Sequence, residues 1–176
     1  MVKAAAVVSG DGEELQSLLD GMFFGEVPNF ALTAVVSTTP GSKALRRAAG
    51  QNIAGYTVDA GIFPNAATFT RALTAKLQDI DAEMVILAAL SPEPGEALYR
   101  EYAGKCVCLR IALSGGEAVA TALLADADGS EARRFGRVSV EAAPGGDFAS
   151  VRRRLVEAGS GELLTGALKD YMREFH

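Results

Sequence analysis

The residues Lys3 to Ser9 read KAAAVVS, and they lead through the turn Gly10-Asp11-Gly12 into the segment Glu13 to Phe24. The first run is short and continuously apolar, which is typical of a strand buried on both faces. After the turn, apolar residues recur at helical spacing, at Leu15, Leu18, Leu19 and Met22. This stretch therefore predicts a strand, a tight glycine turn and a helix.

The same alternation continues along the chain. Further strands are expected at Phe30 to Ser37, Ile53 to Val58, Glu83 to Ala89 and Cys106 to Leu113, and further helices at Gly41 to Gly50, Asn65 to Asp79 and Pro94 to Ala103. Continuously apolar strands that alternate with helices indicate a parallel sheet covered on both faces. Because the crossovers are right-handed, the prediction is an α/β fold with a Rossmann-like, doubly wound and mostly parallel sheet.

The pattern changes after Leu113. Two β-like runs, Val119 to Ala125 and Phe135 to Val140, flank the acidic turn Asp126 to Gly129, which predicts an antiparallel extension of the sheet. Two amphipathic helices are expected after it, at Asp147 to Ala158 and Gly161 to Phe175. No linker divides the sequence, so residues 1–176 are expected to form one domain.

Composition excludes several classes of protein. A net charge of −5 over 176 residues argues against binding to nucleic acid or to an anionic membrane, because both need a positive surface. The arginines at 133–137 and 152–154 are accordingly expected on solvated faces. No apolar window reaches the ~18 residues of a membrane span and no signal peptide is recognisable, so a cytoplasmic protein is expected.

The single histidine, His176, is the last residue of the sequence. A terminal residue is poorly placed to act in an active site. The position of His176 therefore argues against Ser-His-Asp and Cys-His triads and against histidine-rich zinc sites. No metal site is expected, since Cys106 and Cys108 have no further cysteine or histidine to complete a zinc shell.

The glycine turn is the first candidate site. Gly10, Asp11, Gly12, Glu13 and Glu14 lie where a strand meets a helix, and backbone amides in such a turn can bind an anion. The alternative is a structural turn. Each glutamate would repel a phosphate by about 4 kcal/mol at about 4 Å, which favours the structural interpretation.

The other two candidates lie later in the sequence. Cys106, Cys108 and Arg110 alternate along the fifth strand and share one face, where the thiols are either core residues or part of a site. Asp128, in the acidic turn, is either a general base or a turn-stabilising residue.

Four segments in order, VVSGDGEELQSLLD (7–20), MVILAAL (84–90), YAGKCVCLRIAL (102–113) and ADADGSEARRFGRVSV (125–140), resemble the folate-dependent glycinamide ribonucleotide formyltransferases. The resemblance implies a Rossmann-like formyltransferase domain with a phosphoribosyl-amine substrate at Gly10 to Glu14. It also implies 10-formyltetrahydrofolate in a neighbouring cleft, at Ala88, Ala89, Leu90 and Ser91.

The resemblance also identifies departures from the family. Cys108 and Arg110 stand where the family carries its catalytic Asn and His, whereas Asp128, followed by Gly129, matches the family's catalytic Asp. One hypothesis is a non-catalytic protein that binds a small molecule or a partner chain, and a homodimer is left open. The other is a transferase that uses Asp128 with Cys108 or Arg110 and retains 10-formyltetrahydrofolate. The first hypothesis is favoured. Formyl transfer without an imidazole needs other groups for proton transfer and for oxyanion stabilisation, and each of these contributes a rate factor of roughly 100 or more.

Overall fold

The computed structural model describes residues 1–142 and 146–176. Strands and helices alternate through the first two-thirds of the chain, and two helices end it. The elements are β1 (Val2–Val8), α1 (Glu14–Phe23), β2 (Phe30–Ser37), α2 (Lys43–Ala49), β3 (Ala54–Thr57), a 3₁₀ helix (Ala60–Ile62), α3 (Ala66–Asp79), β4 (Met84–Ala88), α4 (Glu96–Glu101), β5 (Cys106–Ser114), β6 (Glu117–Ala125), β7 (Glu131–Glu141), α5 (Phe148–Glu157) and α6 (Ser160–Phe175).

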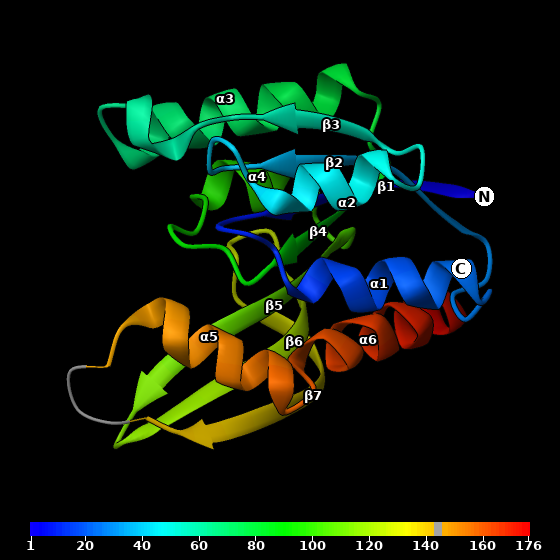
Figure 1. Ribbon diagram of the computed structural model, residues 1–176. Coiled ribbons are helices and arrows are strands. Elements are labelled where there is room, and N and C mark those ends of the chain that lie inside the picture. Colours follow the sequence, from blue (N-terminus) through cyan, green and yellow to red (C-terminus); the bar gives the residue numbers. More distant parts are fainter. Residues whose placement is uncertain (143–145) are drawn as a thin grey trace.

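One seven-stranded sheet with the order β3-β2-β1-β4-β5-β6-β7 runs through the molecule (Figure 1). The first five strands pair in parallel, and β5, β6 and β7 pair antiparallel. The predicted α/β fold with a mostly parallel sheet and an antiparallel extension is confirmed. The extension begins earlier than expected, because β5 itself turns back into β6 through Gly115 and Gly116, both at positive φ.

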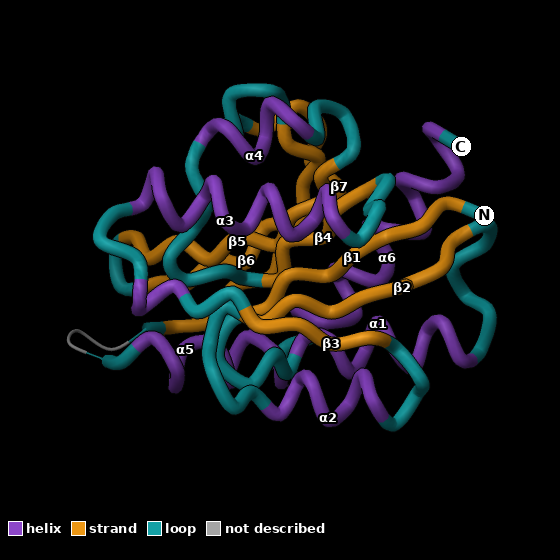
Figure 2. Tube along the Cα trace, turned by 90° about the horizontal axis from the view of Figure 1, so that it is seen from above, coloured by secondary structure: helices purple, strands orange, loops and turns teal. Residues whose placement is uncertain are grey.

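Helices cover both faces of the sheet, as Figure 2 shows from above. On one face, α1, α2, α5 and α6 bury leucines such as Leu15, Leu155 and Leu164 against the strands. On the other face, α3 and α4 bury Phe69, Leu73 and Leu98. Strand β4 is buried along its whole length, which explains its continuously apolar sequence.

The order of the strands reverses at β1. The chain adds β2 on one side of β1 and later adds β4 on the other side. In open α/β sheets, ligands bind beyond the carboxyl ends of the strands at such a switch point. The glycine turn follows β1 at this place. The first β-strand, its turn and the loops after β2 and β4 therefore form the region where a site is expected.

Candidate ligand pocket

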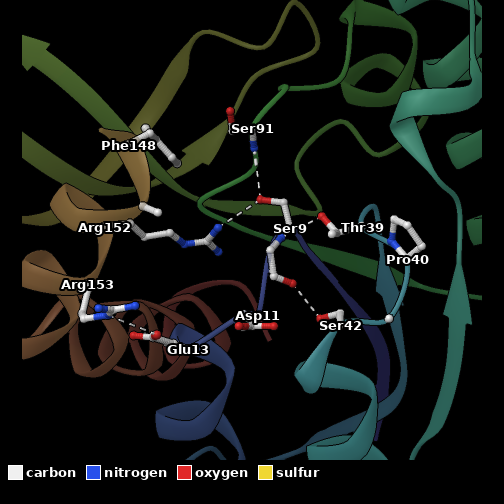
Figure 3. Close-up of a pocket in the computed structure, with 14 residues that line it drawn as sticks. Ser9, Asp11, Glu13, Thr39, Pro40, Ser42, Ser91, Phe148, Arg152 and Arg153 are labelled. Carbon is white, nitrogen blue, oxygen red and sulfur yellow. Dashed lines mark hydrogen bonds and ion pairs between the residues drawn. The ribbon is translucent and has the colours of Figure 1, made fainter. Parts of the chain in front are cut away.

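A pocket of about 460 Å³ opens at the carboxyl ends of β1, β2 and β4 (Figure 3). Ser9 and the glycine turn form its floor, the loop after β2 and the start of α2 form one wall, and the first turns of α5 form the opposite wall. Its lining consists of Ser9, Gly10, Asp11, Gly12, Glu13, Thr39, Pro40, Gly41, Ser42, Ser91, Phe148, Ala149, Arg152 and Arg153.

The glycine turn is fastened to the loop beside it. The amide of Gly10 donates to Thr39 Oγ1 at 2.8 Å, and the Ser42 hydroxyl donates to the Gly10 carbonyl at 2.6 Å. Gly12 has φ +57°, and a Cβ at this position would lie 2.9 Å from Cβ of Ala44. Glycine is required here because a side chain would collide with α2.

A buried ion pair joins α5 to the start of α1. Arg152 Nε and Nη2 donate to the two carboxylate oxygens of Glu14 at 2.7 and 2.9 Å, and the side chains are 11% and 0% exposed. The same guanidinium donates from Nη1 to Ser9 Oγ at 3.1 Å and from Nη2 to the Ala88 carbonyl at 3.2 Å. The expectation that Arg152 lies on a solvated face is wrong, because Glu14 provides a counter-charge inside the protein.

Carboxylates also lie at the other helix starts around the pocket. The amide of Lys43, at the start of α2, donates to Asp11 Oδ1 at 3.3 Å, and the amide of Ser150 in α5 donates to Asp147 Oδ1 at 2.7 Å. Arg153 is loosely paired with Glu13 at 3.8 Å. The hydrogen bonds to Ser150 hold the pKa of Asp147 below its usual value. Asp11 and Arg152, both in the pocket lining, are thus paired within the protein.

The structure places four of the five glycine-turn residues, Gly10 to Glu13, in the lining of the pocket. Glu14 lies behind it, in the ion pair with Arg152. Sequence reasoning did not propose Thr39, Ser42, Phe148 or Arg152 as site residues. The only signal for Arg152 was the run of three arginines, which a solvated surface explains equally well.

The residues proposed for a folate cofactor are mostly buried. Ser91 lines the pocket and is exposed, whereas Ala88, Ala89 and Leu90 belong to the core. Ala89 has φ +54° and its amide donates to the Leu109 carbonyl, so this turn ties β4 to β5.

The two cysteines of β5 lie in the core beneath α3 and α4, on one face of the strand, as predicted, with Val107 and Leu109 on the other. Cys106 is 0% and Cys108 1% exposed, and their sulfur atoms are 3.6 Å apart. The hydrogen bond with Cys108 and burial raise the pKa of the Cys106 thiol well above its usual value. Neither sulfur reaches the pocket lining.

Arg110 lies on the same face, nearer the surface. Its Nε is 3.3 Å from a carboxylate oxygen of Glu93, and its guanidinium carbon is 5.3 Å from the ring centre of Tyr99. Burial is the main cause that raises the pKa of the Tyr99 hydroxyl. Arg110 therefore has partners on the loop after β4 and on α4, outside the pocket.

Asp128 lies in the exposed turn between β6 and β7. Its Oδ1 accepts from the hydroxyl and the amide of Ser130 at 2.5 and 2.9 Å, and these bonds lower the pKa of Asp128. The following Gly129 packs against Tyr99, where a Cβ would lie 2.9 Å from the ring. Asp128, Cys108 and Arg110 are all absent from the pocket lining.

Within residues 1–142 and 146–176, no group of three or more metal-binding side chains is found. No helix in the same part of the chain is long and apolar enough to cross a membrane.

Known proteins match this chain in structure. No family model and no curated protein matches its sequence. Glycinamide ribonucleotide transformylase 1 from Geobacillus kaustophilus superposes with a TM-score of 0.76 at 21% identity, over 98% of this chain and 99% of that one. The enzyme of that name from Symbiobacterium toebii gives a TM-score of 0.78 at 20% identity, over 98% and 88%. A formyltetrahydrofolate deformylase from Pseudomonas syringae gives 0.74 at 15% identity, over 98% and 62%. The chain therefore has the fold of the glycinamide ribonucleotide formyltransferases.

Proposed function

We propose that this protein binds a small polar ligand in the pocket at the carboxyl ends of β1, β2 and β4, and that it does not transfer formyl groups. One observation carries the proposal. The pocket is built around a largely buried arginine, Arg152, which is ion-paired with Glu14, whereas none of the three candidate catalytic side chains is in the pocket lining.

The chemistry of the three side chains argues against transfer. Cys108 is buried, and Asp128 accepts hydrogen bonds from Ser130. Arg110 forms an ion pair with Glu93, although its buried Nε has no hydrogen-bond partner among the described residues. The single histidine is His176, and its Nε2 lies 3.3 Å from the hydroxyl oxygen of Tyr171 at the end of α6. Formyl transfer to an amine needs a group that removes the amine proton and another that stabilises the oxyanion. None of these side chains is free and placed in the pocket to do either.

The position of the pocket supports ligand binding. It lies at the switch point of an α/β sheet, which is where this class of fold binds small molecules. The structurally similar enzymes are named for a ribonucleotide substrate. Compounds related to glycinamide ribonucleotide are therefore the first ligands to test.

Two measurements test the proposal. A tetrahydrofolate-release assay with glycinamide ribonucleotide and 10-formyltetrahydrofolate should give no turnover. A rate near the enzyme median of about 10 per second would instead support the transferase that uses Asp128 with Cys108 or Arg110. Thermal shift with a metabolite panel should identify a ligand, because a compound at about 100 times its Kd adds about 2.7 kcal/mol of stability.

A matched pair of variants locates the binding site. Ala149 is exposed and lines the pocket, whereas Ala158 is exposed at the other end of α5 and does not. Ala149→Phe should abolish the thermal shift, and Ala158→Phe should preserve it. If both variants keep the thermal shift, the assignment of the ligand to this pocket is wrong.

A further inference from the structure

We infer that the ligand of this pocket is nucleoside-like: it carries a flat aromatic ring that lies against Phe148, joined to a hydroxyl-bearing part that reaches the glycine turn. The inference rests on the proposed ligand-binding function and specifies the chemical class of the ligand. It depends on the surroundings of Phe148 and on the polar groups elsewhere in the pocket lining.

Phe148 differs from the other phenylalanines of the chain in its surroundings. It is half-buried and lines the pocket. Within the described residues it packs against neither of the two apolar core clusters, and no aromatic or cationic group stacks on its ring. Each of the other seven lies in a core cluster, packs against one, or contacts another aromatic ring: Phe23, Phe24, Phe30, Phe63, Phe69, Phe135 and Phe175. The ring of Phe148 therefore presents apolar surface to the pocket.

Helix α5 positions this ring. Phe148, Val151 and Leu155 follow the spacing of an apolar helix stripe, but only Val151 and Leu155 are buried in the core. Arg152, one turn after Phe148, forms an ion pair with Glu14, which fastens the helix to the start of α1. A ring held in place before binding loses little conformational freedom when a ligand binds. Because the face of such a ring stacks best with another flat ring, the α5 wall favours an aromatic ligand.

The polar groups of the pocket suit the other part of such a ligand. The Thr39 hydroxyl accepts a hydrogen bond from the Gly10 amide and can donate its own hydrogen to a ligand. Asp11 binds the Lys43 amide through Oδ1, and a carboxylate has about four acceptor positions, so it can also accept from hydroxyl groups. Thr39 belongs to the wall opposite α5 (Figure 3). A ligand that spans the pocket therefore meets an aromatic surface at one end and hydroxyl-binding groups at the other.

Calorimetry with methyl β-D-ribofuranoside and with adenosine, guanosine, cytidine and uridine tests the inference, because the nucleosides add a flat base to the same sugar. At least one nucleoside should bind the wild-type protein about tenfold more tightly than the methyl riboside, or better.

Phe148→Leu keeps an apolar side chain but removes the ring. It should lower the affinity for that nucleoside about tenfold, as expected when one stack between a base and an aromatic side chain is lost, and leave the methyl riboside within about twofold. Phe135→Leu, on β7, is the matched control and should change neither affinity, because this ring is also half-buried but is not in the pocket lining. Far-UV circular dichroism confirms that both variants are folded.

Each outcome decides a separate question. If no nucleoside binds more tightly than the methyl riboside, the inference is wrong, while a ligand found in the metabolite panel still supports the proposed function. If Phe148→Leu leaves the nucleoside affinity unchanged, or Phe135→Leu lowers it as much, the base does not lie against Phe148 and the inference is again overturned. If neither these compounds nor any member of the metabolite panel binds, the proposed function fails, and the inference with it.

Discussion

Replacing Glu14 by Gln should destabilise the protein by about 3 kcal/mol. The carboxylate is fully buried and accepts two hydrogen bonds from Arg152. Gln has nearly the same shape, but its amide nitrogen would face one guanidinium nitrogen, so one charged hydrogen bond worth about 1.5–3 kcal/mol is lost. The guanidinium, 11% exposed, also loses its counter-charge, and breaking a buried pair costs about 3–5 kcal/mol. At about 2–4 °C per kcal/mol, Tm should fall by roughly 6–12 °C.

Urea unfolding followed by far-UV circular dichroism measures this change, because the protein has no tryptophan for fluorescence. Glu13→Gln is the control: its exposed pair with Arg153 should contribute less than about 1 kcal/mol. In the double variant Glu14→Gln with Arg152→Met, neither charge remains buried, so the loss should be smaller than the sum of the two single losses. A Glu14→Gln protein within about 1 kcal/mol of the wild type would refute the view that this ion pair fastens α5.

Three further predictions concern the glycine turn, the core thiol and the acidic turn. Gly12→Ala should lower the free energy of unfolding in urea by about 2–5 kcal/mol, because Gly12 has a positive φ and its new Cβ would collide with Ala44. Gly41→Ala, also at positive φ but in open space, should lower it by only about 1–2 kcal/mol. Equal losses would contradict the steric argument. Because the pKa of the Cys106 thiol is raised in the folded protein, this thiol loses its proton at lower pH in the unfolded chain. The free energy of unfolding should therefore decline as pH rises above about 9. Cys106→Ala, measured under reducing conditions, should lessen this decline. Asp128→Ala should leave ligand-induced thermal shifts unchanged, since the side chain lies outside the pocket, and a lost shift would place Asp128 in the site.

The fold was predictable because its signals are local. Phe30 to Ser37 is a strand with the predicted bounds, and Ser42, Asn65 and Asp147 cap the helices that follow them, each accepting an amide hydrogen bond. Strand β7 was predicted too short at its start. Its first residues, Glu131 to Arg134, are charged and exposed because β7 is an edge of the sheet, and exposed edge strands carry charges that hide the strand pattern.

The pocket was less predictable because its key contacts are long-range. In the sequence, a run of arginines looks the same whether the side chains are solvated or ion-paired. Arg152 is largely buried only because the fold places it against Glu14. The face shared by Cys106, Cys108 and Arg110 followed correctly from the two-residue period of a strand. The period does not determine how deep that face lies, because depth depends on the packing of α3 and α4 above it.

The ion pair between Glu14 and Arg152 also has a consequence for synthesis on the ribosome. The two residues are 138 positions apart, so at about 5–20 residues per second roughly 7–28 s pass between their incorporation. Until Arg152 emerges, Glu14 has no counter-charge, and its burial would be strongly unfavourable. A nascent chain that already contains the whole parallel part of the sheet therefore keeps the start of α1 hydrated, and the pocket is complete only after α5 has been synthesised.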